Sequence, residues 1–198
     1  MASSAPARTS PLQPKDWLRA ASLRLASDGV ESVRVELLAR DMGVSKGSFY
    51  WHFRDRDDLL SQLLSLWENE EINWIEAAVT GVHSPPSRWA RFIHRCSAPD
   101  RLRLEVAIRS WARKERGVAF RVSTMEKRRA SYLEAILGEI GFTRSAAAQW
   151  SELALLTYLG WVDRASRDPE FQQSGPVLSE LLSDMILAAS SKSLHAQA

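Results

Sequence analysis

Apolar residues recur every three or four positions through most of this chain, with polar and charged residues between them. This spacing predicts an all-α protein built from amphipathic helices. Helices are expected over residues 16–27, 55–79, 89–94, 102–112, 120–140 and 147–162, with a last one from Pro176. Gly29, Gly81, Gly117 and Gly141 follow four of these segments, and we expect them to mark helix ends.

A short helix, a tight turn and a second short helix are predicted between Val35 and Phe53. Gly43 suits the left-handed backbone position that commonly ends a helix. Val44 is expected to be the buried pivot of the turn, and the hydroxyl of Ser45 to cap the second helix. The segment therefore predicts a helix-turn-helix.

The second helix of this pair carries polar and aromatic side chains on one face. Phe49 and Phe53 are four residues apart and are expected to anchor the opposite face to the core. The side chains turned outward are then Lys46, Ser48, Tyr50, Trp51 and His52. A helix-turn-helix lays its second helix in the major groove of DNA. We expect the first two side chains to lie at base edges and the other three near sugar and phosphate.

Two further residues near this helix bear on DNA binding. Gly47 has no side chain, which would let the helix backbone approach the groove closely. Arg56 follows Asp55, the expected N-cap of the next helix, and is the best candidate for a phosphate clamp. Spacing alone leaves an alternative open: helix pairs with a glycine turn occur in many proteins, and Tyr50 and Trp51 would then simply cover the core.

The run GVSKGSFYWHF, followed by Arg56 and a Leu-Leu pair, resembles the DNA-binding signature of the TetR family of transcriptional repressors. The resemblance implies three N-terminal helices, of which the second and third form the helix-turn-helix, and a larger helical domain that binds a ligand and dimerises. The resemblance implies DNA contacts from Lys46, Ser48, Tyr50, Trp51, His52 and Arg56, and the expected DNA-binding set also includes Arg34, Ser45 and Gly47. Arg34 departs from the family pattern, because many members have a capping Ser or Thr there; its charge would lie beside phosphates or in solvent.

Three parts are predicted along the chain. Residues 1–14 form a Ser- and Pro-rich disordered arm, residues 15–54 a helix-turn-helix DNA-binding domain, and residues 55–198 a helical effector-binding and dimerisation domain. The net charge is only +2, and residues 1–56 hold nine Lys or Arg against six Asp or Glu. The basic excess thus lies in the DNA-binding part, but it is small enough that two subunits must act together.

The last two expected helices carry more apolar surface than one buried face requires. The helix of residues 147–162 is apolar on two sides, and the final helix has a continuous apolar stripe. We expect a dimer interface formed by Leu155, Leu159, Val162, Leu178, Leu181, Leu182 and Met185. A twofold axis there would place two reading helices in successive major grooves of an approximately palindromic operator. The alternative is that these stripes only close the core of a monomer.

The chain contains eight tryptophans, most of them in the expected larger domain. Aromatic walls suit flat or apolar ligands, although ordinary core packing would also explain most of these residues. The expected pocket residues are Trp67, Trp111, Met125, Trp150 and Tyr158. The resemblance implies that an effector bound there shifts the helix of residues 55–79 and releases DNA, while a co-repressor arrangement stays open.

Other function classes find less support in the sequence. His83, His94 and His195 share no helical ligand spacing, and no phosphate-binding glycine loop or nucleophile elbow is present, so we expect no enzyme, cofactor or metal site. The single cysteine, Cys96, excludes an intrachain disulfide.

No apolar run approaches the roughly twenty residues that cross a bilayer, and no signal-like stretch opens the chain, so we expect a cytoplasmic protein. The remaining alternative is a helical protein-interaction scaffold, or a small-molecule-binding protein without specific DNA recognition.

Overall fold

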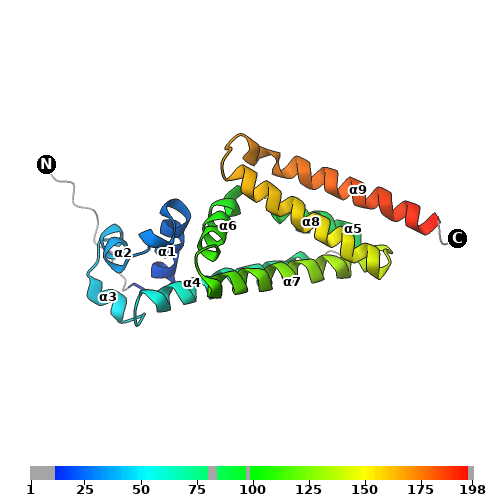
Figure 1. Ribbon diagram of the computed structural model, residues 1–198. Helices are drawn as coiled ribbons and strands as arrows, with labels where there is room; N and C mark the ends of the chain where they lie inside the picture. Colours follow the sequence, from blue (N-terminus) through cyan, green and yellow to red (C-terminus); the bar gives the residue numbers. More distant parts are fainter. Residues whose placement is uncertain (1–11, 80–83, 97–98, 196–198) are drawn as a thin grey trace. The chain divides into compact units, whose positions relative to one another are not determined.

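The computed structural model describes residues 12–79, 84–96 and 99–195, which form helices joined by short turns (Figure 1). The all-α prediction is confirmed over these ranges. Most of the expected N-terminal arm, Gly81 and His83 lie outside the described residues. No described helix is both long and apolar enough to cross a membrane.

The chain divides into two compact units, residues 1–66 and 67–198. Helix α4 (Arg56–Val79) contributes residues to both units. The division therefore lies further along this helix than the boundary after residue 54 that the sequence suggested.

The N-terminal unit is built from α1 (Pro14–Asp28), a 3-10 turn (Val30–Ser32), α2 (Val35–Met42), α3 (Lys46–Tyr50) and the beginning of α4. Helix α1 starts with a proline, whose missing N–H costs nothing there, and stops at Gly29, whose φ is 77°. Its buried residues Trp17, Ala21 and Leu25 recur every four positions and so form one face. This face is the support on which the helix-turn-helix rests.

The larger unit contains α5 (Pro85–Cys96), α6 (Pro99–Ala112), α7 (Arg116–Ile140), α8 (Arg144–Ala165) and α9 (Gly175–His195). Helices α7 and α8 pack on each other, α6 contacts both, and α9 packs on α5 (Figure 1). The main hydrophobic core of the larger unit includes Trp89, Phe92, Leu133, Ile136, Leu137 and Ile186. A smaller cluster of Leu102, Trp161, Val162 and Ala165 joins α6 to α8.

Several helices of the larger unit extend beyond the expected ranges: α5 was expected over 89–94 and α8 over 147–162, and both are longer at each end. Gly141, with φ 112°, ends α7, and the Thr143 side chain accepts a hydrogen bond from the backbone N–H of Ala146 to cap α8. Gly117 does not end a helix but lies in the first turn of α7. The reason is that the apolar stripe of α7 already begins at the buried Val118, so the helix must start before it. At Gly117 no hydrogen bond is lost, because the N–H groups of a first helical turn have no partner within the helix.

Candidate functional site

The turn between α2 and α3 has the predicted geometry. Gly43 lies in the left-handed region, with φ 68° and ψ 34°, and the N–H of Val44 donates to the carbonyl of Ala39 at 2.9 Å. Val44 is half-buried rather than buried. Ser45 occupies the N-cap position of α3, but the predicted hydroxyl cap is wrong, because the helix N–H of Ser48 bonds to the backbone carbonyl of Ser45 instead.

Helix α3 is fixed to the core by its aromatic residues. Phe49 is fully buried, its ring meets Trp17 edge-on at 5.3 Å, and it stacks on Phe53 at 5.2 Å. The opposite face consequently points to solvent, where Tyr50 is 60% and Trp51 87% exposed. The Trp51 ring therefore does not cover the core, whereas the Tyr50 ring meets that of Phe49 edge-on at 5.3 Å and still exposes most of its surface.

Lys46, at the first position of α3, is exposed and has one partner on α2. Its ammonium donates to Glu36 Oε1 at 3.0 Å, and this hydrogen bond lowers the pKa of Glu36. Both side chains are more than half exposed, so the pair contributes little to stability. Lys46 can consequently exchange Glu36 for a phosphate or a base edge without disturbing the fold.

Gly47, Ser48 and His52 complete the outward face of α3. Ser48 and His52 are half-buried, and the His52 ring lies edge-on to Phe53 at 6.4 Å. A Cβ added to Gly47 would meet Ser45 Oγ at 3.7 Å, an ordinary contact. No contact among the described residues therefore requires glycine at this position, and close approach to DNA there stays a prediction.

Arg56 has a structural role at the start of α4. Its Nε donates to the carbonyl of Val33 at 2.6 Å, and one terminal nitrogen donates to the carbonyl of Val30 at 2.7 Å. The predicted cap beside it is confirmed, since Asp55 Oδ1 accepts from the N–H of Asp58 at 2.8 Å. Arg56 thus ties α4 to the loop that precedes α2, and its contact with phosphate stays a prediction.

Arg34 lies at the N-cap of α2 and makes no capping hydrogen bond. Its side chain is exposed, and its Nε donates to the carbonyl of Glu31 at 3.1 Å. The guanidinium is therefore held near the N-terminal end of α2 on the surface of the unit, in a place that a DNA phosphate could reach.

A small cavity lies inside the larger unit, among α5, α7, α8 and α9. Its volume is about 30 Å³, room for about one water molecule. Its walls include Phe92, Cys96, Arg129, Tyr158, Trp161 and Leu178.

Among the expected pocket residues, only Tyr158 lines this cavity. Trp67, Trp111 and Met125 are buried elsewhere, and Trp150 packs against Phe142 at 6.4 Å. Helices α4 and α6, which carry Trp67 and Trp111, contribute no residue to this wall, and Met125 and Trp150 are not among the wall residues of α7 and α8. A role of these four residues in ligand binding stays a prediction.

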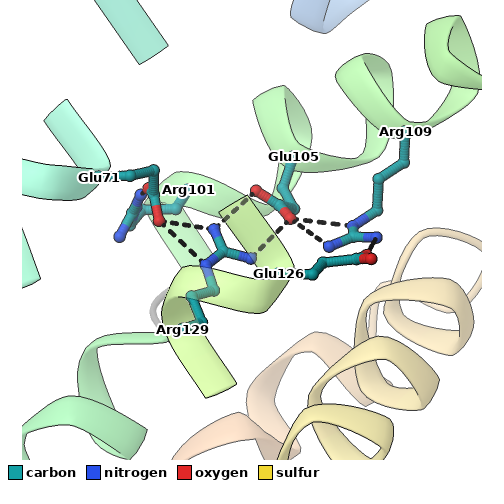
Figure 2. A network of polar contacts seen from close by, with 6 residues as sticks. All are labelled: Glu71, Arg101, Glu105, Arg109, Glu126 and Arg129. Atoms are coloured by element: carbon teal, nitrogen blue, oxygen red, sulfur yellow. Dashed lines mark hydrogen bonds and ion pairs between the residues drawn. The ribbon is translucent and has the colours of Figure 1, made fainter. Parts of the chain in front are cut away.

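A buried network of ion pairs borders the cavity (Figure 2). Arg129 of α7 donates to Glu71 Oε2 at 2.6 Å and to Glu105 Oε1 at 3.2 Å. Glu105 also pairs with Arg109, which reaches Glu126, while Glu71 pairs with Arg101. Burial alone would raise the pKa of Glu105, but the guanidiniums of Arg129 and Arg109 outweigh it and lower the pKa from 4.5 to about 2. Within the described ranges, no metal-binding group of three His, Cys, Asp or Glu side chains occurs.

The helix-turn-helix also matches known proteins. Residues 18–63 match the sequence profile of bacterial regulatory proteins of the tetR family. The N-terminal unit of this chain is thus similar in sequence to the DNA-binding part of tetR-family regulators. The HTH-type transcriptional regulator AcrR of Shigella flexneri is 43% identical over 53 residues, which are 26% of this chain and 23% of that protein. The sequence similarity to this curated relative thus covers about a quarter of its length.

Solved structures share the fold of this chain well beyond the helix-turn-helix. A transcriptional regulator from Rhodococcus sp. Rha1 matches with a TM-score of 0.73 and 20% identity, over 92% of this chain and 97% of that one. FadR from Bacillus subtilis, solved in complex with stearoyl-CoA, matches with a TM-score of 0.62 and 18% identity, over 86% and 98%.

The residues expected at the TetR-type dimer interface fall into two groups. Leu181 and Met185 are 54% and 55% exposed. The others are turned inward: Val162 and Leu182 are buried, Leu155 and Leu178 line the cavity, and Leu159 is half-buried. The core of the single chain already uses these inward residues. Among the described residues, the exposed large apolar side chains of α8 and α9 are instead Leu153, Leu156, Val177, Leu181, Met185 and Leu187.

Proposed function

We propose that this chain is a ligand-responsive, DNA-binding transcription regulator. The observation that carries the proposal is the outward face of α3. Phe49 and Phe53 anchor this helix, while Lys46, Tyr50 and Trp51 stand in solvent on its other side. Cationic and hydroxyl groups on the second helix of a helix-turn-helix are suited to base edges and phosphates.

We further propose that the regulator is a repressor, works as a homodimer in the cytoplasm and binds an approximately palindromic operator. The exposed apolar residues of α8 and α9 support the dimer, because such surfaces usually mark interaction sites. Twofold symmetry would present two copies of α3 to two half-sites.

The effector is proposed to be a small molecule that binds in the larger unit. A cavity already exists there, and FadR, which shares the fold, was solved with stearoyl-CoA. Binding releases DNA if the effector prefers the conformation that cannot bind the operator, and a coupling of about 1–3 kcal/mol changes the affinity about five- to 150-fold.

The test is a titration of the full chain with the intergenic DNA beside its own gene, followed by fluorescence anisotropy at several salt concentrations. We expect Lys46→Ala to weaken binding and to reduce the slope of log K against log salt by about 1, as expected for one lost phosphate contact. Tyr50→Ala should weaken binding as well.

Lys127→Ala is the matched control, because Lys127 is an exposed cation on α7 of the larger unit. It should leave both affinity and salt slope unchanged. Weak binding that neither Lys46→Ala nor Tyr50→Ala alters would contradict specific DNA recognition by α3.

A further inference from the structure

We propose that the cavity of the larger unit takes an uncharged, largely apolar ligand with a hydrogen-bond-accepting oxygen, which binds the indole N–H of Trp161. The inference rests on the proposed function, since it names the chemical class of the effector. Two features support it. The charged groups at the cavity already form ion pairs with one another, whereas the buried indole N–H of Trp161 in the cavity wall has no hydrogen-bond acceptor among the described residues.

Arg129 is a charged residue of the cavity wall, and each of its three guanidinium nitrogens donates to a carboxylate. Nε and Nη2 donate to Glu71 Oε2 at 3.2 and 2.6 Å, and Nη1 donates to Glu105 Oε1 at 3.2 Å. Both carboxylates are buried, at 0% and 4% exposure. An anionic ligand that took over Arg129 would break a buried ion pair and leave Glu71 with Arg101, or Glu105 with Arg109, as its one remaining arginine partner, which is unfavourable.

The surrounding network does not favour a charged ligand of either sign. Figure 2 shows three arginines and three glutamates joined through Arg129, so their formal charges cancel. The cavity therefore has no net charge beside it to attract a carboxylate, a phosphate or an ammonium group.

The other polar side chains in the cavity wall are uncharged, and the remaining wall side chains are hydrocarbon. The Tyr158 ring lies 5.2 Å from the Arg129 guanidinium carbon, and burial raises the pKa of its hydroxyl. Burial likewise raises the pKa of the Cys96 thiol to about 12. Phe92 and Leu133 supply apolar surface. An apolar or aromatic body is the best match for such walls.

Trp161 supplies the polar recognition. This residue is 4% exposed, and its indole N–H is buried with no acceptor among the described residues. An indole nitrogen can only donate, and an unmet buried donor is costly. A carbonyl or ether oxygen of a ligand would satisfy it. Because the cavity holds about 30 Å³, such a ligand must also spread the helices around it, which couples binding to a change of shape.

Three probes of similar size test the assignment: acetophenone, which has an acceptor oxygen, ethylbenzene, which has none, and benzoate, which is an anion. Each is titrated into the ¹⁵N-labelled full chain, with the tryptophan indole signals followed by NMR. We expect acetophenone to move the Trp161 signal and to bind about fivefold tighter than ethylbenzene. Benzoate should bind more weakly than both.

Trp161→Phe assigns the signal and should abolish the preference for acetophenone over ethylbenzene. Trp111→Phe is the control, since Trp111 also has a buried indole N–H without an acceptor but does not line the cavity. If Trp161→Phe does not fold, the order of the three probe affinities in the wild-type chain still tests whether the cavity prefers an uncharged ligand with an acceptor oxygen.

Tighter binding of benzoate, no binding of acetophenone, or a Trp161 signal that acetophenone leaves unmoved would each overturn the assignment. The operator titration is run without any probe, so loss of the DNA-binding proposal and loss of the ligand assignment are read from separate measurements.

Discussion

Arg56 and Lys46 are two cations near the proposed DNA surface, and the fold uses them differently. Arg56 donates to two backbone carbonyls, whereas Lys46 has a solvent-exposed carboxylate as its partner. Carbonyl groups at a loop have few other donors, so Arg56 is needed for the fold. Lys46 is available for DNA because its existing contact is weak and easily exchanged.

Arg56→Gln should lower the free energy of unfolding by about 1–3 kcal/mol, because hydrogen bonds from a charged donor are lost and glutamine reaches at most one of the carbonyls. Urea unfolding followed by circular dichroism measures the change. Arg54→Gln is the control, since the Arg54 side chain is 85% exposed and its removal should change stability little. Unchanged stability together with a smaller salt slope of DNA binding would instead assign Arg56 to a phosphate.

Gly47→Ala should change stability and DNA binding in opposite directions. The added methyl group has room, so the higher helix propensity of alanine should stabilise the chain by roughly 0.5–1 kcal/mol. The same methyl group would hold α3 away from the groove and lower operator affinity by about tenfold, or 1.4 kcal/mol. Thermal unfolding and anisotropy titration measure the two effects. Equal operator affinity of variant and wild type would mean that the α3 backbone does not approach DNA at Gly47.

At the scale of elements, the angle between α2 and α3 depends on the backbone of Gly43. Its φ of 68° lies where a Cβ clashes with the backbone, although nothing else lies within 4 Å of that position. Gly138 offers a matched comparison, because it has equal space but lies within the helix α7.

Gly43→Ala should therefore destabilise the chain by about 1–2 kcal/mol, while Gly138→Ala should stabilise it by roughly 0.5–1 kcal/mol. Chemical unfolding of both variants beside the wild type tests the pair. A stabilising Gly43→Ala would be incompatible with the left-handed turn.

At the scale of the whole molecule, the dimer depends on side chains that the single chain does not need. The double variant Leu181→Glu, Met185→Glu should fold and sediment as a monomer, because both residues are more than half exposed and charges at an apolar interface are unfavourable. Sedimentation velocity gives the answer. Phe120→Glu, on α7, is the control for an exposed apolar residue elsewhere and should leave the oligomer unchanged. A persistent dimer would place the interface on another surface.

The acid stability of the larger unit should depend on Glu105. Its pKa is lowered to about 2, so the stability from its ionised form is present above about pH 4.5 and is lost as the pH falls toward 2. Glu105→Gln should be less stable at pH 7, by about 3–5 kcal/mol, because Arg129 loses a buried partner. Between pH 5 and 2 the variant should lose less stability than the wild type. Parallel losses in the two proteins would contradict the low pKa.

Several features of the candidate site could be predicted from neighbouring residues in the sequence. The left-handed Gly43, the inward pair Phe49 and Phe53, and the Asp55 cap each depend on a few adjacent positions. Local backbone conformation and helical periodicity determine such features, so the sequence contains them directly.

The ion-pair network and the cavity could not be predicted in this way. Arg129 and Glu71 are 58 positions apart, and no periodicity relates them. The residues of the cavity wall likewise depend on helices that are distant in the sequence. Helix α8 has two apolar faces, and its packing against α5, α7 and α9 decided that Tyr158 and Trp161 line the cavity while Leu156 remains exposed.

The sequence by itself determined that this protein is all-α, that Val35 to Phe53 forms a helix-turn-helix, and that α3 turns a polar and aromatic face outward. Only the tertiary structure decided that the carbonyls of Val30 and Val33 bind Arg56, and that the core buries Val162 and Leu182. The physical reason is one of range. Turns and helical faces follow from residues a few positions apart, whereas burial and ion pairing depend on which distant helices meet.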